Sequence, residues 1–255
     1  RILKEGPFEN VHVPPSPGDA GSAIGCAQYV YYNHHKNPKN IEFDNSKMIS
    51  ENVYVGPSYD ENQIKNFLDS INVEYSNYDE NQLLQKTAQL ISEGNVIGWF
   101  QGKMEWGPRA LGNRSILADP RQKNMKDILN EKIKHRESFR PFAPSIMEEF
   151  VSEYFDIDRI SPYMLFVAPV KRKSDIPAVT HVDGTGRLQT VSKNSNSLYY
   201  NLINEFYKIT GVPVLINTSM NVKGEPIVNT PEQAYNMLTK TDMDYLVIGN
   251  NMVKR

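Results

Sequence analysis

The sequence is poor in cysteine and has no long apolar run, and both absences narrow the class of protein. Its single cysteine, Cys26, cannot form an intrachain disulfide, which is compatible with a reducing compartment. No segment approaches the roughly 18 consecutive apolar residues that a membrane span needs. The opening Arg-Ile-Leu-Lys-Glu is not typical of a signal peptide. We therefore expect a cytoplasmic protein without a membrane partner.

Several catalytic motifs are absent as well. There is no Gly-x4-Gly-Lys-Ser/Thr loop, no Gly-x-Gly-x-x-Gly opening a helix, and no Gly-x-Ser-x-Gly, Cys-x-x-Cys or His-Glu-x-x-His. The Ser-Thr-Arg-Thr loop of aspartate and ornithine carbamoyltransferases is missing too. The residues that remain predict a site that positions phosphates and stabilises charge, without a nucleophile–base pair.

Charge is nearly balanced overall but concentrated locally. The chain has 28 Lys and Arg against 30 Asp and Glu, which excludes nucleic-acid binding through a general positive field. Residues 101–140, however, hold ten basic and five acidic residues. Arg109 and Arg140 lie there beside glycine and proline, in Gly-Pro-Arg and Arg-Pro. Guanidinium groups held by such turns predict a cradle for phosphate or carboxylate oxygens, whereas 123–132 predicts a charged surface helix.

Two further loops carry polar residues that packing does not require. One is His181-Val-Asp-Gly-Thr-Gly-Arg187, and the other is Asn217-Thr-Ser219-Met-Asn, directly after an apolar strand. Taken alone, Asn217 and Ser219 are typical of an ordinary turn that ends a strand. Because ligands favour the ends of strands in such sheets, the three loops together favour a nucleotide site. We expect them to converge on one pocket.

Strand and helix patterns alternate along most of the chain, which predicts an α/β or α+β sheet layered with helices. Expected strands are 73–75, 95–101, 115–118, 142–147, 162–170, 188–191, 211–217 and 245–248, and expected helices are 58–71, 79–92, 122–133, 148–154, 196–210 and 231–240.

Residues 1–35 are too short to bury a core of their own. An extended segment and a turn precede a helix in which Asp19 takes the N-cap position. Asp19 serves only as this cap, or it lines a nucleotide or metal site. Cys26 lies on a small-residue helix face, where we expect a buried, packing thiol. Residues 36–50 are polar and predict a linker, and His34 with His35 predicts a frayed helix end.

Three long motifs carry a resemblance to a known family. They run from Gln101 to Arg121 (QGKMEWGPRALGNRSILADPR), from Lys134 to Pro144 (KHRESFRPFAP) and from Asn217 to Val228 (NTSMNVKGEPIV). Together they resemble the C-terminal part of the O-carbamoyltransferases, a family with members in nodulation-factor, cephamycin and aminoglycoside modification. The resemblance covers nearly the whole chain.

The resemblance implies a fold and a division of labour. Residues 1–50 would be the tail of an actin-like (Kae-like) ATPase domain plus a linker, and residues 51–255 a YrdC-like domain with a twisted mixed sheet and flanking helices. The YrdC-like domain would convert carbamoyl phosphate and ATP to carbamoyl adenylate. The actin-like domain would then pass the carbamoyl group to the hydroxyl of a small-molecule or sugar acceptor. Asp19 matches one of its metal-ligand positions, so iron or another divalent metal would belong to that domain, whose His-containing motif this chain lacks.

The resemblance also implies site residues. The positions that match carbamoyl-phosphate and ATP ligands are Arg109, Lys134, Arg140, Arg187, Asn217 and Ser219. Of these, Lys134, Arg140 and Arg109 would be catalytic, with Mg²⁺ on the triphosphate. The alternative is a YrdC-like module that binds a nucleotide or RNA without turnover. The balanced overall charge favours a small-ligand pocket, and we do not expect a nucleic-acid partner.

Overall fold

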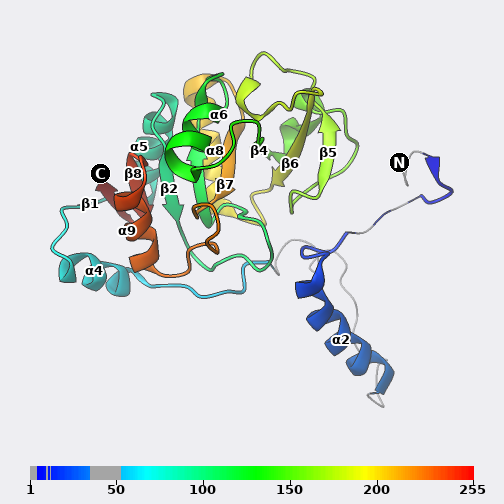
Figure 1. Cartoon of the computed structure of the whole chain (residues 1–255), viewed down its shortest axis with the longest axis horizontal. Helices are drawn as coiled ribbons and strands as arrows, with labels where there is room; N and C mark the ends of the chain where they lie inside the picture. The colour runs from blue at the N-terminus through cyan, green and yellow to red at the C-terminus, as the bar shows by residue number, and fades with distance from the viewer. Residues whose placement is uncertain (1–4, 10, 12, 35–52) are drawn as a thin grey trace.

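We describe the protein from a computed structural model, in which residues 5–9, 11, 13–34 and 53–255 are described. Within these residues nine strands form one mixed sheet, in the order β1-β9-β8-β2-β3-β7-β4-β6-β5 (Figure 1). The β2–β8 and β4–β6 pairs are parallel, and the other pairs are antiparallel. The strands are β1 (Ser76–Asn77), β2 (Ile97–Phe100), β3 (Arg114–Ala118), β4 (Ala143–Met147), β5 (Phe166–Pro169), β6 (Thr185–Val191), β7 (Val214–Ser219), β8 (Tyr245–Ile248) and β9 (Asn251–Lys254).

Helices pack along the sheet. The α-helices of the described chain are α2 (Asp19–His34), α4 (Glu61–Ser70), α5 (Glu80–Ser92), α6 (Met125–Ile128), α7 (Val151–Tyr154), α8 (Ser197–Thr210) and α9 (Pro231–Lys240). Short 3₁₀ turns η3 (Glu148–Phe150) and η4 (Pro177–Val179) and the π-helical η2 (Leu129–Lys134) complete the set. Helices α5 and α8 pack on each other and on β3, β4 and β7, while α9 packs on β2 and β8. No helix of the described residues is long and apolar enough to cross a membrane.

Capping residues lie at the N-terminal ends of helices α5 and α9. Asp79 accepts a hydrogen bond from the Gln82 backbone and caps α5, and Gly94 follows its end with a φ of +94°. Thr230 and Gln233 form a capping box at α9, with Pro231 at the first helical position. The expected helix 231–240 and strand 245–248 are confirmed, and the expected helix 79–92 begins one residue later, at Glu80.

Other elements depart from the sequence expectation. The expected helix 122–133 is a short α-helix that continues as the π-helical η2. Strand β6 begins at Thr185, three residues early, because β5 pairs with its first half. Residues 73–75 form no strand; β1 follows them instead. Strand β9 was not expected, although the Gly249-Asn250 turn that joins it to β8 is a hairpin signal.

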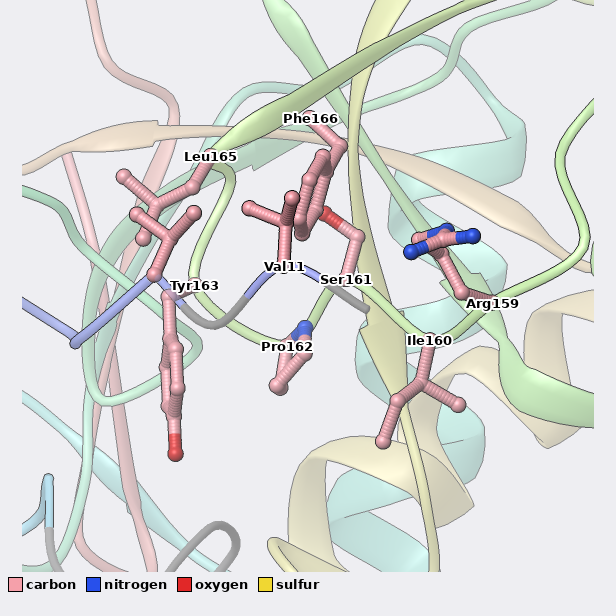
Figure 2. Close-up of a pocket in the computed structure, with 9 residues that line it drawn as sticks. Val11, Arg159, Ile160, Ser161, Pro162, Tyr163, Leu165 and Phe166 are labelled. Carbon is pink, nitrogen blue, oxygen red and sulfur yellow. The ribbon is translucent and has the colours of Figure 1, made fainter. Parts of the chain in front are cut away.

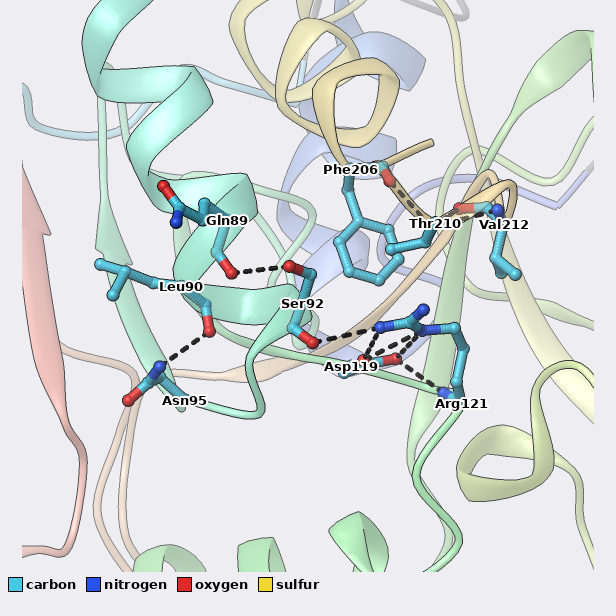
Figure 3. Close-up of polar contacts among 9 residues, drawn as sticks. All are labelled: Gln89, Leu90, Ser92, Asn95, Asp119, Arg121, Phe206, Thr210 and Val212. Atoms are coloured by element: carbon cyan, nitrogen blue, oxygen red, sulfur yellow. Dashed lines mark hydrogen bonds and ion pairs between the residues drawn. The ribbon is translucent and has the colours of Figure 1, made fainter. Parts of the chain in front are cut away.

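A buried ion pair joins the end of β3 to α5 (Figure 3). The Asp119 carboxylate is fully buried and lies 2.6 Å from the Arg121 Nη2. The same Nη2 donates to the Ser92 carbonyl at 3.2 Å, at the C-terminal end of α5. The Arg121 guanidinium also lies 5.4 Å from the Phe206 ring centroid of α8. The Asp-Pro-Arg turn therefore holds two helices against the sheet.

The N-terminal helix α2 stands apart from the sheet (Figure 1) and buries none of its residues. Cys26 is exposed, so the expectation of a buried thiol is wrong: among the residues that the structure describes, none buries the small-residue face of α2. Asp19 is exposed. It is the first residue of α2, so it lies one position inside the helix and not at the N-cap position that the sequence predicts for it. The expected domain boundary after residue 50 lies outside the described residues and stays a prediction.

Candidate functional site

A small pocket collects residues from the three loops that the sequence singled out. We call it the arginine pocket, and its volume is about 90 Å³. Arg109, Arg187, Asn217 and Ser219 all lie in it, although they are spread over more than 100 residues of sequence. Its lining is Pro108, Arg109, Ala110, Arg136, Pro141, Phe142, Ala143, Met164, Arg187, Asn217, Thr218 and Ser219.

Sheet topology explains this convergence. Strand β7 carries Asn217 and Ser219 at its C-terminal end, where Asn217 is paired with Ala143 of β4. Strand β6 lies on the other side of β4 and carries Arg187. Arg109 comes from the loop between β2 and β3, and β3 is the other neighbour of β7. Adjacent strands therefore bring distant loops to one place.

A buried carboxylate shapes the loop that carries Arg109. Glu105 Oε1 accepts hydrogen bonds from the backbone N–H groups of Leu111 and Asn113, each at 2.7 Å. Gly112 takes a φ of +109°, and a Cβ there would lie 2.2 Å from the Tyr199 ring, so only glycine fits. Glu105 thus fixes the loop without touching the pocket.

Arg114 belongs to the same motif but has a structural role. It is fully buried, its guanidinium lies 3.7 Å from the Phe100 ring centroid, and it donates to backbone carbonyls. These carbonyls belong to Gln101, Asn113, Pro57 and Gly102. Burial lowers the pKa of Arg114 to about 10, with Glu105 opposing the shift. Nη1 and Nη2 are therefore occupied, and Nε, which has no partner, belongs to a residue outside the arginine pocket lining.

Three arginines converge in the arginine pocket, and no carboxylate lines it. Burial, followed by the charges of Arg109 and Arg136, lowers the pKa of Arg187 to about 10. Burial and the charge of Arg140 lower the pKa of Arg136, and Glu137 opposes them. Like charges brought together at reduced dielectric repel one another, so an anion between them would be stabilised strongly.

Buried polar atoms without partners lie in this pocket. They are Nε of Arg109, Nε of Arg187 and Oδ1 of Asn217. Buried polar groups are normally hydrogen-bonded, and an unpaired one costs roughly 1–3 kcal/mol. Two donors and one acceptor left open in one pocket indicate a ligand that carries both acceptor and donor atoms.

A buried amide network determines which Asn217 atom is left without a partner. Asn217 Nδ2 donates to Gln189 Oε1 at 2.9 Å, and the Ser145 hydroxyl donates to the same oxygen at 2.7 Å. Gln189 Nε2 donates to the Leu111 carbonyl at 2.8 Å. Both hydrogen bonds end on Gln189 Oε1, so the orientations of the Gln189 and Asn217 amides agree with each other. Asn217 Oδ1 is then the atom without a hydrogen-bond partner.

Lys134 lies behind the pocket wall and supports the end of β7. Its Nζ donates to the Ser219 carbonyl, and to the carbonyl and side-chain oxygens of Asn221 at 3.0 and 2.9 Å. A longer contact of 3.4 Å reaches the Ser219 hydroxyl, which does face the pocket. Burial, with a contribution from Arg136, lowers the pKa of Lys134 to about 7.

The structure does not bring Arg140 into the pocket lining. Its side chain is about half exposed, and its Nε lies 2.9 Å from Glu137 Oε2. The neighbouring residue, Pro141, does line the pocket. Arg140 therefore lies at the rim and would have to leave Glu137 to contact a ligand.

Two site residues escaped the sequence reasoning. Arg136 lies within the basic stretch, but its neighbours gave no reason to prefer it to Lys132 or His135. Gln189 is a buried amide between Leu188 and Thr190 in a predicted strand, and a polar side chain that a strand buries is a signal that could have found it.

No metal site is evident in the described part of the chain, where no group of three or more His, Cys, Asp or Glu is placed to hold an ion. Asp19 has no such partners there. The arginine pocket offers no carboxylate for Mg²⁺ either, so Mg²⁺ would have to arrive on a triphosphate.

A second hollow of about 180 Å³ lies between the N-terminal segment and residues 159–166 (Figure 2). Val11 and Val13 from that segment meet Pro162, Leu165 and Phe166 there. Its lining is mostly apolar, with Arg159 as its charged residue, so it lacks the convergent charges of the arginine pocket. This hollow lies where the N-terminal segment meets the body of the protein.

Comparison with known proteins places these features in a family. The family profile described as Carbamoyltransferase C-terminus matches residues 88–255. The chain is 43% identical over 274 residues to a protein of Synechocystis sp., covering 98% of this chain and 44% of the relative. It is 41% identical over 265 residues to nodulation protein NolNO of Sinorhizobium fredii, covering 100% of this chain and 37% of NolNO. The chain thus spans less than half the length of these relatives.

A solved structure supports the fold assignment. The Sua5 protein of P. abyssi, complexed with L-threonine, aligns with a TM-score of 0.50 at 15% identity, over 69% of this chain and 48% of Sua5. This likeness concerns the fold alone, and with the mixed sheet it confirms the expected YrdC-like class. With the profile covering most of the sequence and relatives above 40% identity, the chain belongs to the carbamoyltransferase C-terminus family.

Proposed function

We propose that this chain binds carbamoyl phosphate and ATP and forms carbamoyl adenylate, from which the carbamoyl group passes to a hydroxyl acceptor. The observation that carries the proposal is the arginine pocket: three arginines, no lining carboxylate, and unpaired buried atoms of both donor and acceptor type. Membership in the carbamoyltransferase C-terminus family supports the chemical class.

The open acceptor favours carbamoyl phosphate over plain phosphate. Arginine N–H groups match phosphate oxygens, but they leave Asn217 Oδ1 without a donor. Phosphate at neutral pH offers at most a P–O–H donor, whereas the carbamoyl group carries an NH₂ beside its phosphate. One small molecule would then satisfy the open groups of opposite type.

The proposed chemistry is electrostatic. Water cleaves carbamoyl phosphate to carbamate and phosphate, and a carbamate oxygen then attacks the α-phosphorus of ATP. A new P–O bond forms, the bond from the α-phosphorus to the bridging oxygen breaks, and pyrophosphate leaves. Arg109, Arg136 and Arg187 would neutralise the charge that gathers during both steps. Lys134 would hold Ser219 in place, and Arg140 would exchange Glu137 for a phosphate oxygen.

Transfer to the final acceptor would need more than this chain. Iron or another divalent metal, and recognition of the small-molecule or sugar hydroxyl, would belong to the further length that the relatives have. The tail of an actin-like domain remains our expectation for residues 1–50.

The deciding experiment incubates the chain with ATP, Mg²⁺ and carbamoyl phosphate and measures pyrophosphate and carbamoyl adenylate. We expect both products from wild type, and little of either from Arg187→Ala or Arg140→Ala. Arg140→Lys should also give little of either product, because the ammonium group of lysine cannot form the paired hydrogen bonds of the planar guanidinium group. Arg172→Ala is the matched control, since that arginine is half exposed and pairs with Asp175 outside the pocket.

Two results would contradict the proposal. The first is pyrophosphate release that does not depend on carbamoyl phosphate. The second is tight, steeply salt-dependent RNA binding in a filter assay with no pyrophosphate release, which is the result expected of a binding module without turnover.

A further inference from the structure

The arginine pocket is too small for a whole nucleotide. Its volume of about 90 Å³ falls well below the roughly 300–1,000 Å³ of pockets that enclose drug-sized ligands. A phosphate or carbamoyl group fits inside. The nucleoside part of ATP, which the proposed function requires, must therefore lie outside the pocket, against its rim.

The turn that leads into the pocket, residues 137–140, forms the part of its rim next to Pro141 and carries one exposed aromatic side chain. Phe139 is 73% exposed, and Pro141, two residues further on, lines the pocket. In residues 53–255, all of which the structure describes, Phe139 is the only aromatic among the exposed large apolar side chains. A lone exposed apolar residue is ordinary, so the position at the pocket rim is what distinguishes this one.

The turn that presents Phe139 is braced on both sides. Glu137 lies 3.1 Å from Lys223 Nζ and 2.9 Å from Arg140 Nε. The Arg140 N–H donates to the Glu137 carbonyl at 3.2 Å, which closes the turn. Asn130 Nδ2 donates to the carbonyls of Ser138 and Arg140, at 3.2 and 3.0 Å. Phe139 is thus held in a fixed backbone, with its ring in solvent.

We propose that Phe139 is the stacking platform for the base of the nucleotide whose phosphates reach Arg136 and Arg140. This inference rests on the proposed function. Aromatic rings stack on nucleobases with little preference among the bases, and arginines beside them bind the phosphates. Arg140 belongs to the same turn as Phe139, and Arg136, which lines the pocket, immediately precedes that turn, so one ligand with a flat base and a polyphosphate chain would use all three.

The test compares ATP with inorganic tripolyphosphate, which has the charge but no base. In Phe139→Ala, ATP affinity should fall roughly 5- to 150-fold, which corresponds to about 1–3 kcal/mol of stacking. Tripolyphosphate affinity should not change. Phe139→Trp should keep ATP affinity, and ATP should quench its emission more than tripolyphosphate does. The matched control is Phe8→Ala, an exposed phenylalanine that does not line the pocket.

The outcomes separate this inference from the proposed function. If wild type binds ATP and forms pyrophosphate but Phe139→Ala binds ATP as tightly, the stacking role of Phe139 is wrong and the proposed function is supported. Equal losses for ATP and tripolyphosphate would also overturn it, because the ring would then only shape the turn. If Phe139→Ala weakens ATP binding but not tripolyphosphate binding, and wild type releases no pyrophosphate, the stacking role of Phe139 is supported and the proposed function is wrong. An oligouridine that binds more tightly than ATP and depends on Phe139 would overturn the nucleotide assignment.

Discussion

At the scale of single residues, the site is defined by atoms left without partners. Arg109 Nε, Arg187 Nε and Asn217 Oδ1 are buried and open in one pocket. The Gln189 amide accepts a hydrogen bond from Asn217 Nδ2, which leaves the acceptor Oδ1 as the unpaired atom of a residue that lines the same pocket as the three arginines. That geometry selects for a donor on the ligand, and it can be tested without turnover.

Asn217→Ala should change ligand preference as well as affinity. Removing Oδ1 deletes one hydrogen bond to the carbamoyl NH₂, worth about 0.5–1.5 kcal/mol. Carbamoyl phosphate should therefore bind roughly 2- to 10-fold more weakly relative to inorganic phosphate, as measured by calorimetry on both ligands. The ratio is the readout, since any general damage weakens both. An unchanged ratio would show that Asn217 does not read the carbamoyl group.

Lys134 should make anion binding pH-dependent. Its pKa in the empty protein is about 7, so it is largely neutral at pH 8 and charged at pH 6. An anion nearby favours the ammonium and raises this pKa, so binding takes up a proton at and above pH 7. Sulfate affinity should therefore fall as pH rises from 6 to 9, and Lys134→Met should flatten the profile.

Sulfate is the right probe for this measurement because it does not titrate in that range. Calorimetry in buffers of different ionisation enthalpy counts the proton directly. A pH-independent affinity in wild type would show that the Lys134 charge does not reach the pocket. Arg187, whose pKa is lowered only to about 10, stays charged below pH 9.

At the scale of elements, the turn after β3 holds the sheet to α5 and α8. Arg121→Ala would leave the fully buried Asp119 carboxylate without its cation. We expect a loss of about 3 kcal/mol, at the low end for a broken buried pair because Arg121 is one-third exposed. Urea unfolding measures this loss. A matched surface control is Arg255→Ala, which removes an exposed pair with Asp242 and should cost less than about 1 kcal/mol.

A double variant checks the cause. If the cost comes from the unpaired carboxylate, Asp119→Asn combined with Arg121→Ala should recover part of the stability lost in Arg121→Ala. A double variant that is less stable than either single one would point instead to the lost packing of Arg121 on Phe206.

At the scale of the whole molecule, clustered positive charge links stability to anions. Arg109, Arg136 and Arg187 repel one another in the empty pocket. A bound anion should stabilise the native state by about 2.7 kcal/mol at 100 times its Kd, or roughly 5–11 °C in Tm for a chain of this size. Differential scanning calorimetry with sulfate and with ATP tests this.

Ionic strength and a variant supply the controls. Sodium chloride should reduce the sulfate-induced gain in Tm, because mobile ions screen charges in an open pocket. Arg187→Ala should reduce the gain at every salt concentration. An equal gain in wild type and Arg187→Ala would place the stabilising anion somewhere else on the protein.

The sequence alone predicted much of the local structure and the loops that form the candidate site. Helix α9 and strand β8 lie where expected because their caps and apolar periods act over a few residues. The three loops could be chosen because polar residues gather in each of them at strand ends, and the family resemblance named Arg109, Arg187, Asn217 and Ser219 within them.

Only the tertiary structure decided which of these groups are free to bind. Arg114 belongs to the same motif as Arg109, but it is buried against Phe100, and its two terminal nitrogens donate to four backbone carbonyls. Lys134 faces the end of β7, and Arg140 pairs with Glu137 at the rim. Gln189 joins the amide network through strand order and register, whereas Arg136 is held in its loop by hydrogen bonds with Asn130. The residue type at each position can be read from the sequence, but the partners of that side chain come from distant segments that meet only when the sheet forms.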